Sequence, residues 1–566
     1  MRIIVASIII FAIGIVNANV YAQNELSKAN SYLENKGEVY FTFNINNKEE
    51  LKILTKIISI DNVKGNSVWA YANKLDFQKF SDLNINYTVL NHPGDLQVEP
   101  KMFDNFDKAT NAWDAYPTYS GYLSMMAQFE TSYPSLCKIV QVGTTKENRK
   151  ILFAKISDNK DIREQEPRVL VISAIHGDEP TGSVTVLRMI DYLLSNYATN
   201  NKIATLINNS EIWVCPFANP DGTWSGGNNS INNATRGNAN NIDINRNFPN
   251  PTGGLHPDNN AWQPETTIFM NLLDSLHFTL SINYHGGSEV VNYPFDSWIS
   301  SDKTHADDNW WQTVSKMYAD TAKQNSSSYM TNVIGSGYIN GGDWYVVEGS
   351  YQDYANYYAQ CRDVTLEISA SKTVNAAILP TYWNYNYKSL FNYIQQSLYG
   401  IHGVVTDACT GSPIRAKIEI LSHDRDSSHV FSASDLGDYY RPIAPGTYSM
   451  KVTASGYPAK TINGIIVNSN STTLVNVQLS CATSLSDNNI IENIVYPNPF
   501  TDEIIINQYS INLEKIVVYS VEGKELYRNN NTKELNKINT KNWEAGIYFL
   551  KLISKSDSRI IRLVKQ

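Results

Sequence analysis

The chain contains 566 residues, of which 46 are Lys or Arg and 55 are Asp or Glu, giving a formal net charge of −9. This length predicts about three or four domains. A hydrophobic share of 42%, with 35 Tyr and 11 Trp, excludes a disordered chain, which would be poor in aromatic residues. A nucleic-acid-binding protein is also disfavoured, because there is no basic excess to neutralise phosphates. Five Cys are too few for a small scaffold stapled by disulfides.

The first 22 residues have the pattern of a secretory signal peptide. Arg2 precedes an uncharged apolar run over residues 3–16, and a small-residue site follows at Val20-Tyr-Ala22. We therefore expect cleavage after Ala22. An N-terminal membrane anchor is the alternative, but the apolar run is shorter than the roughly 20 residues that a membrane-spanning helix needs. No later segment is apolar enough over that length, so the mature chain is expected to have no transmembrane segment.

Residues 37–92 predict a small α/β domain. Strand-like alternation is present at residues 39–44, 68–72 and 87–90, and helical spacing at residues 49–58 and 77–80. A linker rich in Pro and Asp follows over residues 92–106.

Residues 112–399 alternate apolar strand-like runs with helical segments. This alternation is typical of an α/β domain whose largely parallel sheet is flanked by helices. The expected strands cover residues 168–174, 212–217, 279–284 and 364–368. Asn and Gly dominate residues 224–241 and predict a long irregular loop, which is usually functional inside a compact domain.

Two all-β units are expected after the α/β domain. Residues 400–480 predict a small β-sandwich, with short strands at residues 403–407, 416–421, 448–453, 464–467 and 473–479. Cys409 and Cys481 bracket this unit; they would either pair in an oxidising compartment or remain free thiols. A linker rich in Ser and Asn, residues 480–489, leads to a last β-rich unit over residues 490–566.

The strongest local signal of chemistry is a strand-to-helix turn with the sequence His176-Gly-Asp-Glu179, directly after the apolar run 169–173. A His and a carboxylate three residues apart in such a turn can face one point and hold zinc. A capped helix start with a surface His would look similar. His285, which ends another apolar strand, is the expected third ligand. Two His and one Glu leave a zinc position open for water, as in catalytic sites, and ligand crevices form at the carboxyl ends of such strands.

Eight motifs then follow one another along the α/β domain. They are His176-Gly-Asp-Glu179, Asn219-Pro-Asp-Gly222, Arg236-Gly-Asn-Ala239, Asp243-Ile-Asn-Arg-Asn-Phe-Pro249, His285-Gly-Gly287, Asn292-Tyr-Pro-Phe-Asp296, Gly341-Gly-Asp-Trp-Tyr345 and Thr365-Leu-Glu-Ile-Ser369. In this order they closely resemble the zinc metallocarboxypeptidases, specifically the N/E or regulatory subfamily. The resemblance covers about residues 112–480, because that subfamily carries a transthyretin-like domain after its catalytic domain. Three further motifs match that domain: Gly400-Ile-His-Gly-Val-Val-Thr-Asp407, Gly437-Asp-Tyr-Tyr-Arg441 and Pro445-Gly-Thr-Tyr448.

The resemblance implies the roles of the metal-site residues. His176, Glu179 and His285 would bind one Zn²⁺ ion, and Asp243 would orient a zinc-bound His through its second ring hydrogen. Glu367 would act as the general base and then as the acid, taking a proton from the zinc-bound water and returning it to the leaving amine.

The same resemblance implies how the substrate is held. Arg236 would stabilise the oxyanion of the tetrahedral intermediate. Asn245, Arg246 and Tyr345 would hold the free C-terminal carboxylate, a task that suits a planar guanidinium. Turn capping is the alternative role for Asp243 and Asn245.

Asp296 and Gln352 are expected to line the pocket for the substrate's last side chain, since the aligned positions in the subfamily select Lys or Arg. A carboxylate there favours a cation and leaves an apolar side chain facing an unpaired buried charge. A solvated turn residue is the alternative for Asp296. The sequence departs from the subfamily pattern at Asp178, at Gly349-Ser-Tyr351 and after Asp353. At these positions the resemblance predicts neither the local substrate contacts nor the shape of the pocket wall.

The two ends of the chain resemble other modules. Residues 37–92 are similar to the pro- or accessory domains of bacterial metallocarboxypeptidases, either removable or permanent. The motifs Tyr496-Pro-Asn-Pro-Phe500, Ile516-Val-Val-Tyr-Ser-Val-Glu-Gly-Lys524 and Ala545-Gly-Ile-Tyr-Phe-Leu-Lys551 resemble the C-terminal sorting domain of the type nine secretion system. That resemblance implies secretion machinery as a partner and export across an outer membrane to the cell surface or the medium. An ordinary β-sandwich binding module is the alternative.

The sequence therefore predicts a secreted zinc carboxypeptidase that removes single C-terminal residues, preferably Lys or Arg, from peptides or proteins. One alternative is a related zinc hydrolase of cell-wall peptides or N-acyl amino acids, which would need neither Asp296 nor the Arg246 and Tyr345 clamp. Another is an inactive binding protein on the same scaffold, although such proteins typically lose the base or a ligand, and this chain keeps both.

Overall fold

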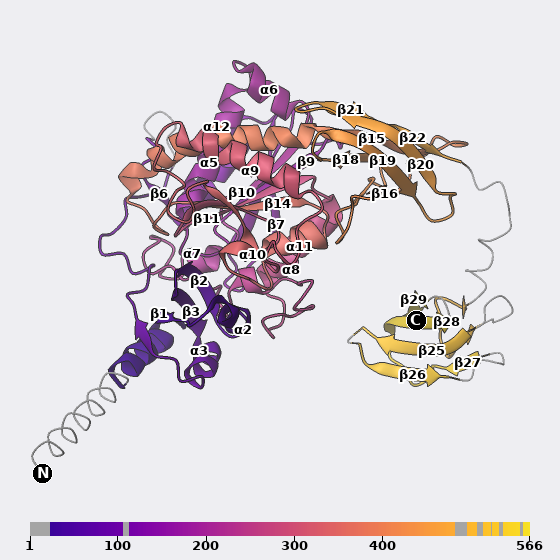
Figure 1. Cartoon of the computed structure of the whole chain (residues 1–566), viewed down its shortest axis with the longest axis horizontal. Coiled ribbons are helices and arrows are strands. Elements are labelled where there is room, and N and C mark those ends of the chain that lie inside the picture. Colours follow the sequence, from indigo (N-terminus) through magenta and orange to yellow (C-terminus); the bar gives the residue numbers. More distant parts are fainter. Residues whose placement is uncertain are drawn as a thin grey trace, which may run out of the picture. The chain divides into compact units, whose positions relative to one another are not determined.

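The computed structural model describes residues 23–105, 112–480, 495–506, 513–521, 523–530, 536–554 and 558–566 (Figure 1). The chain divides into two compact units, the first holding residues 1–453 and 459–478 and the second residues 454–458 and 479–566. The expected signal peptide, Cys481 and nearly all of the linker 480–489 lie outside the described residues. Among the described helices, none is long and apolar enough to cross a membrane.

The N-terminal domain is a small sheet covered by helices, preceded by a helix over residues 23–35. Its strands lie in the order β2-β3-β1-β4. Their bounds are β1 (Glu38–Asn44), β2 (Ser59–Lys64), β3 (Ser67–Asn73) and β4 (Tyr87–Val89), with η1 (Lys48–Glu50), α2 (Leu51–Leu54) and α3 (Lys74–Ser81) between them. Phe41, Phe77 and Phe80 pack in its core, and the side chain of Asn73 caps α3.

Strand β2 is absent from the sequence prediction. The helix expected to run to residue 58 ends at Leu54, and the chain then turns into β2. The segment Ser59-Ile-Asp-Asn-Val-Lys64 does not alternate cleanly, because a bulge lies between Ile60 and Asn62 in its pairing with β3. A bulge places two residues opposite one and breaks the period of two on which strand prediction depends.

An eight-stranded sheet forms the middle of the first unit, in the order β13-β12-β14-β11-β9-β10-β8-β7. Its strands are β7 (Cys137–Thr144), β8 (Lys150–Ile156), β9 (Arg168–Ser173), β10 (Glu211–Cys215), β11 (Leu280–His285), β12 (Glu289–Tyr293), β13 (Tyr338–Asn340) and β14 (Arg362–Ile368). The central strands β10, β9, β11 and β14 run parallel, as do β12 and β13, and the remaining neighbours are antiparallel. The predicted mixed, mostly parallel α/β sheet is thereby confirmed.

Helices cover both faces of this sheet. The larger face packs against α4 (Tyr119–Ser132), α5 (Thr181–Asn196), α9 (Asp308–Lys323) and α12 (Leu379–Gln395), and the other against α8 (Pro264–Leu276) and α11 (Tyr351–Tyr357). In β9, Val169 and Val171 join the first core, whereas Leu170 and Ile172 join the second. A strand buried on both faces reads as a continuous apolar run, which is why its position could be predicted.

Two β-sandwiches follow, and the expected all-β architecture is confirmed for both. The first has one sheet in the order β18-β15-β21, with β22 also paired to β15, and a second in the order β17-β16-β19-β20. Its strands are β15 (Gly400–Asp407), β16 (Lys417–Ile420), β17 (Val430–Phe431), β18 (Asp438–Arg441), β19 (Gly446–Thr453), β20 (Lys460–Val467), β21 (Thr472–Leu474) and β22 (Val477–Leu479). Cys409 is disulfide-bonded, while Cys137, Cys215 and Cys361 are free.

The second compact unit contains the C-terminal sandwich. Its sheets run β23-β24-β27 and β26-β25-β28-β29. The strands are β23 (Val495–Tyr496), β24 (Glu503–Ile506), β25 (Leu513–Ser520), β26 (Glu525–Asn529), β27 (Asn536–Asn539), β28 (Gly546–Ser554) and β29 (Ser558–Lys565). Phe500, Ile504 and Leu550 lie in the core between the sheets.

Candidate active site

Three parallel strands, β9, β11 and β14, end side by side and position the predicted metal ligands and the predicted base. His285, the last residue of β11, pairs in register with Glu367 near the end of β14, and Tyr284 pairs with Ser173 at the end of β9. The turn after β9 holds His176 and Glu179 before α5 begins. Carboxyl ends of parallel strands form a natural ligand crevice, and here the register brings residues almost 200 positions apart to one edge of the sheet.

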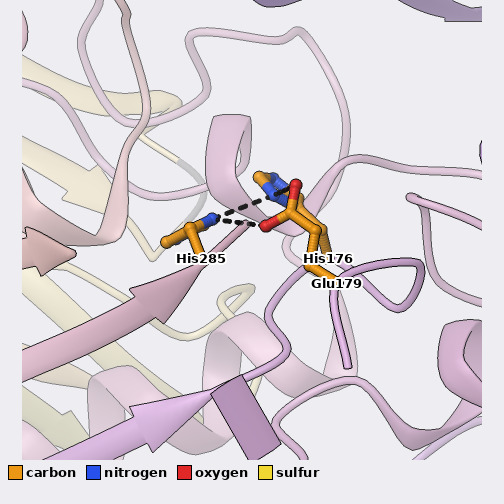
Figure 2. Close-up of side chains that lie close together, drawn as sticks. All are labelled: His176, Glu179 and His285. Carbon is orange, nitrogen blue, oxygen red and sulfur yellow. Dashed lines mark hydrogen bonds and ion pairs between the residues drawn. The ribbon is translucent and has the colours of Figure 1, made fainter. Parts of the chain in front are cut away.

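Figure 2 shows the side chains of His176, Glu179 and His285 converging on one point. The Nδ1 atoms of the two His lie 3.1 Å apart, and the carboxylate oxygens of Glu179 lie 3.1 Å from Nδ1 of His176 and 2.9 Å from Nδ1 of His285. All three side chains are buried, and their donor atoms lie within 4.8 Å of one another. Two ring nitrogens and one carboxylate are a donor set that suits zinc, so these residues fit the implied ion.

The second ring nitrogens of both His are also engaged. Nε2 of His176 lies 3.1 Å from Oδ1 of Asp243, and Nε2 of His285 lies 2.9 Å from the side-chain amide of Asn283. Asp243 also caps a turn, since its Oδ1 accepts from the backbone N–H of Asn245 at 2.8 Å. The predicted orienting contact and its turn-capping alternative therefore coexist. Burial alone would raise the pKa of Asp243, but the charges of Arg236 and His176 hold it well below its usual value.

Arg236 and Glu367 lie beside these ligands. Nη1 of Arg236 is 3.2 Å from Nδ1 of His176 and 3.4 Å from Oε1 of Glu179. Glu367 has a buried oxygen, Oε2, for which the described residues supply no hydrogen-bond partner. Burial, reinforced by the negative charge of Glu179, raises the pKa of Glu367 well above its usual value. An unpaired carboxylate oxygen next to a metal-binding triad is suitably placed to exchange a proton with a water molecule.

Lys372 is a further member of this group that sequence reasoning missed. Its Nζ lies 2.5 Å from Oε1 of Glu179. The sequence offers only a weak signal for it, a Lys five positions after Glu367 in the loop that leaves β14.

The residues expected to hold the substrate carboxylate lie next to one another in the fold. Arg246 ends the short turn η2 (Ile244–Arg246), and Tyr345 directly follows α10 (Gly341–Trp344). The side-chain oxygen of Asn245 accepts from the backbone N–H of Tyr351 at 2.8 Å, which fixes this turn against the start of α11. Gly349 makes a close approach possible, since a Cβ there would lie 2.1 Å from the carbonyl oxygen of Arg246.

Asp296 is buried rather than solvated. Its Oδ1 accepts from the side-chain amides of Gln352 at 2.9 Å and Asn292 at 3.1 Å. Behind it, Asp353 accepts from the backbone N–H groups of Asp296 and Ser297. Burial raises the pKa values of both acids, that of Asp353 to about 8, with the nearby charge of Asp296 adding to the effect. Among the residues that the structure describes, no Lys, Arg or His side chain forms an ion pair with Asp296.

A single cavity of about 30 Å³ joins these groups. Nine of the eleven predicted site residues line it: His176, Glu179, Arg236, Asn245, Arg246, His285, Asp296, Tyr345 and Glu367. The other two, Asp243 and Gln352, lie directly behind it, bonded to His176 and Asp296. Asp61 of the N-terminal domain, which the sequence did not predict as a site residue, also lines the cavity.

Comparisons with known families agree with this architecture. A family model described as zinc carboxypeptidase matches residues 122–389, and a carboxypeptidase regulatory-like domain matches residues 400–480. A secretion system C-terminal sorting domain matches residues 494–566, which indicates export and a location at the cell surface or outside the cell.

Individual relatives extend this likeness. Carboxypeptidase D of Homo sapiens is 33% identical over 378 residues, which make up 64% of this chain and 27% of that protein. The chain thus spans about a quarter of the length of the carboxypeptidase D relatives that it matches. Among solved structures, carboxypeptidase A from Helicoverpa armigera aligns with a TM-score of 0.49 and 17% identity, covering 63% of this chain and 96% of that one. Carboxypeptidase M of Mus musculus is 32% identical over 364 residues, covering 60% of this chain and 79% of its own length. The chain therefore belongs to the zinc carboxypeptidase family.

Proposed function

We propose that this protein is a secreted zinc carboxypeptidase that releases single C-terminal residues, preferably Lys or Arg, from peptides or proteins. The observation that carries this proposal is the single cavity in which the metal-binding triad, Glu367, Arg236, Arg246 and Asp296 meet. A metal-binding site, a base, a carboxylate clamp and an acidic side-chain pocket are the four elements that this reaction requires.

The chemistry divides between the ion and the side chains. Zinc held by His176, Glu179 and His285 would polarise the scissile carbonyl and acidify a water molecule. Glu367 takes a proton from the attacking water and delivers it to the leaving amine, a role that its unpaired buried oxygen supports. Arg236 stabilises the negative charge that develops on the carbonyl oxygen, because its guanidinium is fixed beside the ligands before the reaction begins.

Substrate selection follows from the other end of the cavity. Arg246 and Tyr345 bind the C-terminal carboxylate, which restricts cleavage to the last peptide bond. Asp296 then faces the last side chain of the substrate, and a Lys or Arg there supplies a cationic partner, which no described residue of the chain provides in an ion pair.

The test is release of the last residue from matched peptides that end in Arg, Lys, Leu or Phe, using the zinc-loaded chain. We expect Arg and Lys to be released fastest, with all activity lost on chelation and restored by zinc. Cell-wall peptides and N-acyl amino acids belong in the same panel. Faster cleavage of these compounds, or of peptides ending in Leu or Phe, would reject the proposed specificity.

The sorting domain gives this proposal a location, the cell surface or the medium, reached across an outer membrane. A chain ending after Ser480 keeps every residue of the site and lacks residues 481–566, which comprise the rest of the linker and the matched sorting domain. We expect this shorter chain to be as active as the full chain in cell extracts but to stay inside the cell. Its normal appearance in the medium would contradict the sorting assignment.

A further inference from the structure

Asn283 lies next to one of the predicted zinc ligands. It precedes His285 by two positions on β11, so both side chains point to the same face of the sheet. Asn283 is fully buried, and its Nδ2 lies 2.9 Å from Nε2 of His285. Its other amide atom, Oδ1, has no hydrogen-bond partner among the described residues. Buried polar atoms are rarely left unpaired, so this side chain requires an explanation.

The chemistry of zinc binding sets which atom of Asn283 must face the ring. Nδ1 of His285 points toward Glu179 and His176 (Figure 2), so this nitrogen would supply the lone pair that zinc requires. The hydrogen of the neutral ring then lies on Nε2, which becomes a donor and needs an acceptor. The amide nitrogen of Asn283 is itself a donor and cannot serve.

A half turn of the amide about the Cβ–Cγ bond of Asn283 resolves this conflict. It exchanges Oδ1 and Nδ2, which places an acceptor opposite Nε2 of His285. Because the described residues donate no hydrogen bond to Oδ1, the oxygen gives up none in the exchange. The ring hydrogen and the amide oxygen then satisfy each other.

The two His ligands differ in the partner that orients them. His176 has the carboxylate of Asp243, whereas His285 has a neutral amide. A second carboxylate in place of that amide would add negative charge beside Glu179, whose Oε2 lies 2.9 Å from the same ring. An uncharged acceptor orients the ring without adding that charge.

We propose that Asn283 is a positioning residue for the zinc site, whose side-chain oxygen accepts from Nε2–H of His285 and fixes the tautomer and the orientation of that ring. Asn283 is not among the residues that line the cavity, so it acts through His285 and not on the substrate. The inference rests on the proposed function only through the binding of zinc by the triad.

The test measures the affinity of the full chain for zinc, by competition with a chelator that changes colour when it binds the metal. Asn283→Ala removes the acceptor, and we expect the dissociation constant for zinc to rise by roughly 10- to 100-fold. Asn386→Ala is the matched control. This Asn is equally buried, and its side chain bonds to Tyr318, Tyr329 and Tyr382. We expect that variant to lose stability but to bind zinc as tightly as the unchanged chain does.

Asn283→Asp separates an accepting role from a donating one. Asp is nearly the same size and, when ionised, offers two acceptors and no hydrogen to donate. Measured at about pH 9, far above the usual Asp pKa of about 4, this variant should bind zinc at least as tightly as the unchanged chain. A loss as large as the one expected for Asn283→Ala would overturn the inference, because the amide hydrogens would then matter and not the oxygen. This variant decides the matter if Asn283→Ala does not fold.

A spectroscopic measurement distinguishes positioning from a general loss of stability. Cobalt in place of zinc absorbs visible light in a way that reports the geometry of its ligands. We expect this spectrum to change in Asn283→Ala and to stay the same in Asn386→Ala. An unchanged zinc affinity in Asn283→Ala, or an equal loss in Asn386→Ala, would overturn the inference.

Release of C-terminal residues is measured on the same proteins, so that the two proposals can fail separately. If zinc affinity responds as expected while the unchanged, zinc-loaded chain releases nothing, the role of Asn283 stands and the carboxypeptidase proposal fails. If the unchanged chain binds no zinc, both fail.

Discussion

Glu179 and Glu367 are neighbouring acids whose surroundings give them opposite protonation preferences. Burial would raise the pKa of both. For Glu179 this effect is outweighed by the charges of Lys372 and His176, which hold its pKa well below the usual value. For Glu367, burial and the charge of Glu179 outweigh the opposing charges of Lys372 and Arg236, so that its pKa lies well above the usual value. Pairs of acids separated in this way typically divide the work, one remaining an ionised ligand and the other carrying the proton.

Replacing Glu367 by Gln tests this division. Gln is nearly isosteric but cannot accept the proton of the attacking water, and general-base contributions are typically about 10²–10⁴-fold. We therefore expect turnover of a peptide ending in Arg to fall by at least that factor while zinc content and peptide affinity are preserved. The measurement is single-turnover hydrolysis with zinc content checked by metal analysis. If most of the turnover survives with zinc bound, another residue must be the base.

Replacing Asp296 tests the proposed preference for substrates that end in Lys or Arg. A charge-assisted bond between Asp296 and a substrate Lys or Arg is worth about 1.5–3 kcal/mol. Asp296→Ala should therefore lower kcat/KM for peptides ending in Arg or Lys by roughly 10- to 150-fold. Peptides ending in Leu or Phe serve as the matched controls and should be cleaved at an unchanged or slightly higher rate. Equal losses on both kinds of peptide would mean that Asp296 acts only on the structure of the pocket.

At the scale of elements, the sequence predicts best the strands that are apolar throughout. β9, β10, β11 and β14 lie within three residues of their predicted bounds, because strands buried on both faces carry long apolar runs. β2 escaped prediction because four of its six residues are polar and its pairing contains a bulge. The strand that contributes Asp61 to the cavity is therefore one that the sequence pattern did not predict.

The turn at Gly349 yields a prediction about stability and substrate binding, for which a second glycine, Gly254, provides the control. Gly349 has a φ of +79° and Gly254 a φ of +78°, so Ala at either position meets a similar left-handed backbone cost of about 1–2 kcal/mol. Only at Gly349 would the new Cβ also lie 2.1 Å from the carbonyl oxygen of Arg246, whereas nothing lies within 4 Å at Gly254. We expect Gly349→Ala to lower the free energy of unfolding by more than Gly254→Ala and to raise KM by displacing Arg246. Equal stability losses and an unchanged KM would exclude this role for Gly349.

At the scale of the whole molecule, contacts between domains could not be foreseen. The motifs place His176, Glu179 and His285 in one site because each ends or follows a recognisable strand. Nothing in the sequence links Asp61 to Lys372, since the two are separated by more than 300 positions and share no period or motif. Such pairs depend on how one folded domain docks on another, which local patterns do not encode.

A buried ionic group lies at the contact between the α/β domain and the first β-sandwich. Asp307 precedes α9, and its carboxylate lies 2.9 Å from Nη2 of Arg362 at the start of β14. From the sandwich, Nη2 of Arg441 lies 2.8 Å from Asp307 and also bonds to Asp424. All four side chains are buried. Removing one partner from such a group is strongly destabilising, because the remaining charges stay buried without compensation.

Asp307→Asn should therefore lower the free energy of unfolding of the first unit by about 3–5 kcal/mol near neutral pH. Asp302→Asn is the control; Asp302 is exposed, and a change there should be neutral within about 0.5 kcal/mol.

Burial would raise the pKa of Asp307, but the charges of Arg441 and Arg362 outweigh this effect and lower the pKa to about 2. The pKa of an Asp in an unfolded chain is about 4. The contribution of the Asp307 charge to the free energy of unfolding is thus fully present above about pH 4 and is lost as the pH falls through about 2. Denaturant unfolding of the unchanged chain and of Asp307→Asn, measured from pH 7 downward, should give free energies of unfolding that converge at low pH. If the difference between the two free energies stays constant across this range, the stability lost in Asp307→Asn does not come from the charge.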